Sequence, residues 1–367
     1  MGTGEIATRP QSSVIALDLM RGLAALAVLF SHLRGDAFVE YGSLPASQHG
    51  IAAASVFAAT RIGGEGVLVF FVLSGFLVGG QVLARLHDGR FQLYDYATDR
   101  ATRIFIPLIP ACLFAAVASI VVFGHPPPIG QLLANMIGLN EIVTESLNTN
   151  PILWSLTYEI WFYVLAGVLA YIAVKRTNAI SGILLIICAV VFAVLQTRYL
   201  VFWILGACAS RARIDDRSKA RLALLGAFLG LLGCGLNQLT MDSRSLPAIL
   251  HIPAIVGESL ISVGVVMALP YLTGEHVNAS LERIKPIAAA LAAFSYTLYL
   301  THRPTDAILG LYLGKSEILS IQSFAYYGCR VLICLFVAAV FYFAFERHTV
   351  TVRQILRKHK ASLLRVT

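Results

Sequence analysis

Residues 21–32 read RGLAALAVLFSH, in which an arginine and a histidine bound ten residues that are apolar except for Gly22 and Ser31. Such a stretch is typical of a membrane-spanning helix, which needs about 20 mostly apolar residues. Eleven helical residues turn through about 1100°, so Arg21 and His32 share one stripe, about 16 Å apart along the axis. Ionisable groups at membrane depth are costly, and both residues are therefore candidates for function.

The composition agrees with a membrane location. Of 367 residues, 57% are hydrophobic and 13% are charged, whereas about 25% are charged in soluble globular proteins. The sequence therefore predicts an all-α polytopic membrane protein with the lipid bilayer as a partner. The net charge of +8 comes from basic residues between apolar runs, so no nucleic-acid partner is predicted. The six cysteines have no metal-binding spacing, and no metal site is predicted.

Ten apolar runs are candidate membrane spans. The fifth and sixth runs are short and lie on either side of polar residues 196–198, so they could instead form one hairpin with kinked arms. The segment 129–143 is too short and polar to span, and it is expected to lie along the interface or dip back into the membrane. The ten runs cover residues 14–33, 67–86, 104–123, 152–174, 180–195, 199–209, 222–239, 249–272, 286–301 and 321–345.

The basic residues predict the orientation. With ten spans and a cytoplasmic N-terminus, most Lys and Arg residues fall in cytoplasmic segments, as the positive-inside rule requires. Both termini are then cytoplasmic. The predicted organisation is an N-terminal tail at 1–13, a transmembrane domain at 14–345 and a basic C-terminal tail at 346–367.

A second polar cluster lies in DRATRIFIPLIP, residues 99–110, where Arg100 and Arg103 are one helical turn apart. Two guanidinium groups suit bidentate contact with phosphate, although anchoring at the cytoplasmic face explains arginines here equally well. Pro107 and Pro110 are expected to kink the helix just beyond them and to open a cavity.

Two further clusters are placed near the outer face. In LWSLTYEIWFY (153–163), Trp154 and Tyr158 fit an interfacial aromatic belt, but Glu159 is a carboxylate inside an apolar run. In SYTLYLTHRP (295–304), His302 is expected at the level of His32. The pattern predicts arginines at the inner face, and the histidines with Glu159 at the outer face. A structural salt bridge or a protonated carboxyl would also explain Glu159.

Small residues mark a further segment, GGEGVLVFFVLSGFL at 63–77. The three glycines at 63, 64 and 66 permit an unusual backbone, and the pair Ser74–Gly75 is expected to allow close helix packing.

Together these stretches resemble the membrane-bound acyltransferase 3 family, bacterial enzymes that O-acylate sugars and other cell-envelope acceptors. The resemblance extends from Leu17 to Glu346. It rests on the joint order of five motifs, and it implies a protein of the bacterial inner membrane. The motifs are DLMRGLAALAVLFSH (18–32), GVLVFFVLSGFL (66–77), RATRIFIP (100–107), LWSLTYEIWFY (153–163) and SYTLYLTH (295–302).

The resemblance also implies an acyl-CoA donor, usually acetyl-CoA, that enters from the cytoplasm, with no permanently bound cofactor. Arg21, Arg100 and Arg103 are then expected to bind the donor phosphates. An acceptor hydroxyl needs a general base, and histidine suits that role near neutral pH. The predicted catalytic residues are His32 and Glu159, with either Glu159 or His302 orienting His32 or the acceptor. The predicted substrate-binding residues are Trp154, Ser155, Tyr158 and His302.

A different function class remains open at this point. A proton-coupled transporter or exporter of an envelope precursor would use buried Asp18, Glu159 and Glu258, with histidines, as a proton relay. The chain has no internal repeat of the kind that supports alternating access, which favours the acyltransferase. The sequence leaves the acceptor, the acyl length and the oligomeric state open.

Overall fold

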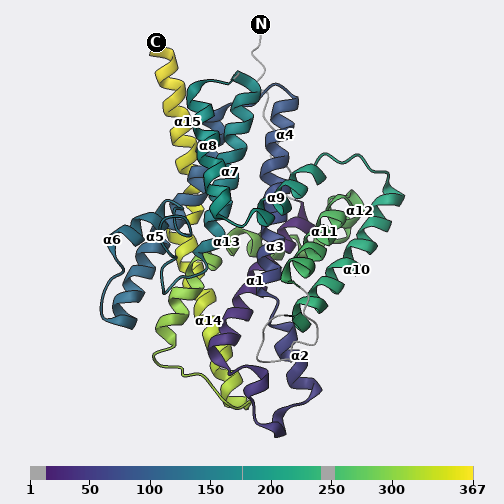
Figure 1. Ribbon diagram of the computed structural model, residues 1–367, viewed down its shortest axis with the longest axis vertical. Helices are drawn as coiled ribbons and strands as arrows, with labels where there is room; N and C mark the ends of the chain where they lie inside the picture. The colour runs from purple at the N-terminus through teal and green to yellow at the C-terminus, as the bar shows by residue number, and fades with distance from the viewer. Residues whose placement is uncertain (1–13, 176, 241–252, 367) are drawn as a thin grey trace.

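The computed structural model describes residues 14–175, 177–240 and 253–366, which are almost entirely helical (Figure 1). The N-terminal tail (1–13) and the start of the eighth predicted run (249–252) lie outside these residues. The helices are α1 (Ile15–Ala37), α2 (Ile51–Ala59), α3 (Gly63–Ser74), α4 (Gly80–His87), α5 (Leu93–Phe123), α6 (Ile129–Met136), α7 (Leu153–Lys175), α8 (Ala179–Val194), α9 (Thr197–Ala209), α10 (Asp216–Thr240), α11 (Ala254–Leu272), α12 (Glu275–Ser280), α13 (Lys285–Leu309), α14 (Ile321–Ala344) and α15 (Thr349–Val366).

Short helical turns join several of these helices. One π-helical turn, η3 (Gly75–Gly79), connects α3 to α4 without a break. The other turns are η1 (Tyr41–Ser43), η2 (Ala46–Gln48), η4 (Glu282–Ile284) and η5 (Glu346–His348).

Within the described residues, eight helices or joined helices are long and apolar enough to cross a membrane, so the chain is a multi-pass membrane protein. The fifth and sixth predicted runs correspond to α8 and α9, which bend by 119° at the break between them. This confirms the alternative of one bent pair with two short arms. The eight segments are Ile15–Ala37, Ile51–His87, Leu93–Phe123, Leu153–Lys175, Asp216–Gln238, Ala254–Leu272, Glu282–Leu309 and Ile321–Lys360.

Two helices extend beyond their predicted apolar runs. Helix α5 begins at Leu93 rather than at residue 104, because ion pairs with α15 stabilise its polar first turns. In one of these pairs an Nη2 atom of Arg357 lies 2.7 Å from Oδ1 of Asp99. Helix α13 continues to Leu309, so His302 lies inside the helix rather than just beyond its end. A hydropathy profile predicts the part of a helix that lies in the membrane core, but it does not predict where the polar ends of the helix stop.

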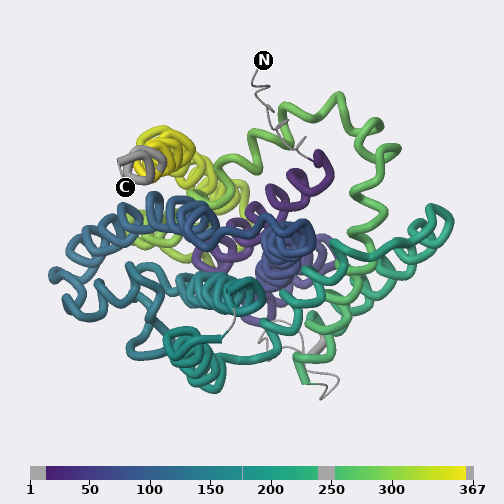
Figure 2. Tube along the Cα trace, turned by 90° about the horizontal axis from the view of Figure 1, so that it is seen from above, coloured from purple at the N-terminus to yellow at the C-terminus, as the bar shows by residue number. Residues whose placement is uncertain are grey.

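Helix α1 lies in the interior of the bundle, where it packs against α3, α13 and α14. Seen from above, α3 and α4 stand near the middle, α5 and α6 extend to one side, and the α10–α11 hairpin extends to the other (Figure 2). We refer to the two ends of the bundle as the α4 end and the α2 end, after the helices that lie there in Figure 1.

Two glycines lie at close helix contacts that bear on the predicted motifs. A Cβ atom on Gly22 of α1 would lie 2.4 Å from Cβ of Leu291 on α13. A Cβ atom on Gly75 would lie 1.9 Å from the Trp203 carbonyl oxygen on α9, which confirms the predicted close packing at Ser74–Gly75. The predicted unusual backbone at 63–66 is wrong. Helix α3 begins at Gly63 and is regular. Gly63 and Gly66 pack closely against Ser31 and Ala24 of α1, where a Cβ atom would not fit.

The segment between α6 and α7 enters the protein instead of staying at its surface. Asn140 and Asn150 are 1% and 0% exposed. Nδ2 of Asn150 donates to the Leu300 carbonyl at 2.9 Å, and Oγ1 of Thr149 donates to the Ala115 carbonyl at 2.7 Å. These side-chain hydrogen bonds attach the buried loop to α5 and α13, and α7 begins inside the bundle.

Candidate active site

A central cavity of about 290 Å3 lies among α1, α3, α5, α7 and α13. It brings together side chains that are far apart in the sequence but come from the predicted motifs. Their meeting in one cavity makes this the candidate donor side of an active site. The predicted residues that line the central cavity are Arg21, Arg100, Arg103, Ser155 and Glu159.

The Glu159 carboxylate is held in a polar network within this cavity. Tyr163 donates its hydroxyl proton to Oε1 of Glu159, and Oγ of Ser74 lies 3.4 Å from the same oxygen. The hydroxyl groups of Ser74 and Tyr163 are 3.0 Å apart, and Nε1 of Trp203 donates to Ser74 at 3.1 Å. These contacts fix the position and direction of the carboxylate.

Glu159 therefore lies with the arginines, and its predicted grouping with the histidines is wrong. The reason is the buried loop before α7. Because α7 begins inside the bundle, Glu159 lies deeper in the protein than its distance from the end of the apolar run indicates. Because its hydrogen bonds go to Tyr163 and Ser74, the alternative in which Glu159 orients His32 is also wrong.

The three arginines differ in their electrostatic partners. Arg103 forms an ion pair with Glu346, which is 3% exposed, and its guanidinium lies 5.4 Å from the Tyr296 ring centroid. Arg21 and Arg100 form no ion pair within the described part of the chain. Nε of Arg100 is buried and has no acceptor there. Arg21 and Arg100 thus offer positive charge and donors to an anionic ligand, whereas Arg103 is already neutralised.

A second cavity, of about 720 Å3, opens at the α4 end and is here called the mouth cavity. Arg21, Leu77 and Gln81 line both the mouth cavity and the central cavity, so the two adjoin. A ligand that enters between α1 and α4 can therefore reach Arg21 and the central cavity. The charged residues that line the mouth cavity are Asp18, Arg21, Arg85, Asp88, Arg90 and Arg211.

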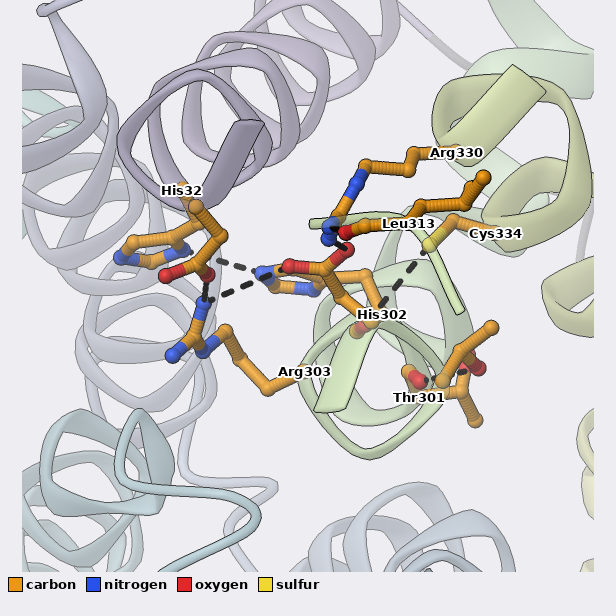
Figure 3. A network of polar contacts seen from close by, with 10 residues as sticks. His32, Thr301, His302, Arg303, Leu313, Arg330 and Cys334 are labelled. Atoms are coloured by element: carbon orange, nitrogen blue, oxygen red, sulfur yellow. Dashed lines mark hydrogen bonds and ion pairs between the residues drawn. The ribbon is translucent and has the colours of Figure 1, made fainter. Parts of the chain in front are cut away.

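The two predicted histidines meet between α1 and α13 (Figure 3). Nδ1 of His32 lies 3.0 Å from Nε2 of His302, and Nδ1 of His302 lies 2.9 Å from the Leu298 carbonyl oxygen. A carbonyl only accepts, so Nδ1 of His302 carries a proton. In a neutral His302 the Nε2 atom then accepts, and His32 donates from Nδ1. This leaves the lone pair of His32 on Nε2.

Tyr299 connects the histidines to the central cavity, which neither histidine lines. Its hydroxyl lies 2.6 Å from Oγ of Ser155, and its ring centroid is 6.1 Å from that of His302. Phe70 packs edge-on against the Tyr299 ring and also lines the cavity. Tyr299 is not among the residues predicted from the sequence, although its position three residues before His302 places the two on one helix face.

Other residues of the site were also not selected. Tyr163 is four residues after Glu159, and this spacing could have placed both on the same side of α7. The sequence predicts only a packing role for Ser74. Gln81 also lines the central cavity, and the signal for it is an amide side chain in an otherwise apolar stretch.

Trp154 and Tyr158 belong to an aromatic cluster and do not line the central cavity. Both rings pack against Phe71 and Tyr199, with centroids between 5.2 and 6.3 Å apart. The Tyr158 hydroxyl accepts the Gln196 N–H at 2.9 Å. Their contact with an acceptor stays a prediction.

Comparison with known proteins places the chain in a family. The family model that describes an acyltransferase domain, that of the acyltransferase 3 family, matches residues 14–343. An uncharacterized protein of Haemophilus influenzae is 25% identical over 144 residues, which cover 36% of this chain and 59% of that relative. The match thus spans less than two thirds of the relative's length. No solved structure matches the chain. The chain belongs to the acyltransferase 3 family and is a multi-pass membrane protein.

Proposed function

We propose that this acyltransferase moves an acyl group, in the simplest case acetyl, from acyl-CoA to a hydroxyl of a sugar or other cell-envelope acceptor in the bacterial inner membrane. The main support is the path from the mouth cavity past Arg21 into the central cavity, which ends at Tyr299 beside the histidine pair. Acyl-CoA is a substrate in this reaction and not a bound cofactor.

The donor enters at the α4 end, which the positive-inside rule assigns to the cytoplasm. The cations of the mouth cavity attract the nucleotide phosphates, and Arg21 and Arg100 bind the anionic part that lies deeper. The pantetheine arm occupies the central cavity with its thioester near Ser155 and Tyr299. Arg21 and His32 are separated by about 16 Å along α1, which leaves room for this arm between a phosphate and the base.

Transfer then takes place at the histidine pair. The acceptor hydroxyl loses its proton to Nε2 of His32 as its oxygen attacks the thioester carbonyl carbon. The new ester bond forms, the carbon–sulfur bond breaks, and the leaving thiolate recovers the proton as the free thiol of CoA. His302 holds His32 in the tautomer that this step needs, because its Nε2 accepts the Nδ1 proton of His32. Tyr299 and Phe70 have to move aside for the thioester to reach His32.

The transporter alternative has less support. Asp18 lines the mouth cavity and Glu159 lines the central cavity, whereas Glu258 lines neither. Instead, Oε2 of Glu258 forms an ion pair with Nε of Arg198 at 2.9 Å. The three carboxylates therefore do not form one relay.

The proposal is tested with purified full-length protein in detergent. Labelled acetyl-CoA is added with cell-envelope glycans, and ester formation is followed by mass spectrometry. We expect acetyl esters with the wild type and none with His32→Ala. If the wild type releases no CoA and forms no ester with acetyl-CoA or a longer acyl-CoA, the proposed donor is wrong.

A further inference from the structure

A third cavity, of about 250 Å3, lies at the α2 end next to the histidine pair and is here called the outer cavity. Asp36 follows His32 by one turn on α1, and Arg303 follows His302 directly on α13. None of its residues takes part in the proposed donor path. The polar residues that line the outer cavity are Asp36, Arg303, Asp306, Lys315 and Arg330.

The charges of the outer cavity form a connected network, part of which is shown in Figure 3. Arg303 forms an ion pair with Asp36, and its Nη1 lies 3.9 Å from Oδ2 of Asp306. Nη1 of Arg330 lies 2.5 Å from Oδ1 of Asp306, and both of these side chains are 2% exposed. Lys315 forms no ion pair among the described residues. Three cations and two carboxylates therefore meet at this cavity.

The network leaves hydrogen-bonding groups unsatisfied. Nε of Arg303 and Nε of Arg330 are buried, and neither has an acceptor in the described part of the chain. Buried donors without partners are costly, and in native proteins each such group has a reason. Ion pairs alone would hold α1, α13 and α14 together, but they do not require an open volume lined by charged side chains.

We infer that the outer cavity is the acceptor subsite and that it binds one sugar residue. This inference rests on the proposed function. Hydroxyl groups both donate and accept, so a sugar can hydrogen-bond to the ammonium group of Lys315 and to the carboxylate oxygens of Asp36 at the same time. The volume is below the 300–1,000 Å3 of typical sites for drug-sized ligands, which suits a single ring. A sugar bound there presents a neighbouring hydroxyl toward His32, one helical turn away.

The first test measures sugar binding without a donor. The full-length protein in detergent is heated with the methyl glycosides of glucose, N-acetylglucosamine and glucuronic acid, each at millimolar concentration. We expect at least one of them to raise the Tm of the wild type. The increase should be lost in Asp36→Asn and Lys315→Gln, and it should be kept in Glu317→Gln, which changes an exposed charge on the same loop. Lys315 is itself exposed, so its variant is expected to fold. If no glycoside raises the Tm, or if both variants keep the increase, the subsite is wrong.

The second test separates this inference from the proposed function. Transfer from labelled acetyl-CoA to envelope glycans is measured for the same three variants, together with the affinity for acetyl-CoA. We expect Asp36→Asn and Lys315→Gln to raise the acceptor KM at least tenfold while donor affinity is unchanged. An unchanged acceptor KM would overturn the subsite even if acetyl transfer is confirmed. If the glycosides bind but acetyl-CoA is not used, the subsite stands and the proposed reaction fails.

Discussion

Nδ1 of His32 on α1 lies 3.0 Å from Nε2 of His302 on α13, and the two rings stack with their centroids 5.3 Å apart. The Leu298 carbonyl accepts from Nδ1 of His302 and thereby sets the tautomers of both rings. In the proposed reaction one histidine is a positioning residue and the other is the base. Carboxylates orient many catalytic histidines, and in this proposal a buried imidazole takes that place.

Replacing His32 by Ala removes the proposed base. We expect kcat for acyl transfer to fall by about 10²–10⁴-fold, the usual contribution of general base catalysis. The KM for acetyl-CoA should stay the same, because Arg21 and Arg100 still bind the donor. The measurement is steady-state transfer by purified protein in detergent. An activity within threefold of the wild type would show that His32 is not the base.

His302 is expected to act through His32, and two substitutions can show this. In His302→Gln the side-chain oxygen can still accept the Nδ1 proton of His32, whereas His302→Ala offers no acceptor at this position. We therefore expect His302→Gln to keep at least ten times more activity than His302→Ala at comparable Tm. Equal loss in the two variants would indicate that the hydrogen bond does not position His32.

Arg100 and Arg103 are expected to respond differently, although they are one turn apart. Arg100→Gln should raise the KM for acetyl-CoA with little change in Tm, because Arg100 has no ion-pair partner among the described residues. Arg103→Gln should lower the stability by about 3 kcal/mol, because it leaves the buried Glu346 carboxylate without its cation. The comparison uses donor titrations and thermal unfolding of both variants.

The control for Arg103 is the double variant Arg103→Gln, Glu346→Gln, which removes both charges of the pair. Its Tm should be higher than that of Arg103→Gln alone. If Arg103→Gln instead raises the donor KM and leaves the Tm unchanged, then Arg103 binds the donor and the pair with Glu346 is not structural.

Gly22 controls the distance between the helices that carry the two histidines. In Gly22→Ala the new methyl group would meet Cβ of Leu291, so α1 has to move away from α13. We expect a loss of about 1–3 kcal/mol in stability, as for other overpacked contacts, and a lower kcat because the histidine pair is pulled apart. Adding Leu291→Gly makes room for the methyl group and should restore both quantities. Thermal unfolding and transfer assays of the two variants decide this, and a Gly22→Ala variant with wild-type values would contradict it.

Much of the fold follows from local properties of the sequence. The run RGLAALAVLFSH predicts a spanning helix, and the helical period alone places Arg21 and His32 on one stripe, because the rise and turn per residue are fixed by backbone hydrogen bonds. A hydropathy profile likewise identifies the apolar segments, because each membrane-spanning helix satisfies its own backbone hydrogen bonds and needs apolar side chains where it meets lipid. Family motifs added the link to acyl transfer.

The tertiary structure decided which of these polar groups meet. His32 and His302 are 270 positions apart, and their contact depends on how closely α1 packs against α13 at Gly22. The buried loop before α7 placed Glu159 among the arginines and away from the histidines. The contacts of Tyr299 with Ser155 and His302 likewise depend on how α13 packs against its neighbours, and so does the outer cavity. Periodicity and hydropathy describe one helix at a time, whereas a site between helices depends on the packing of side chains from several of them.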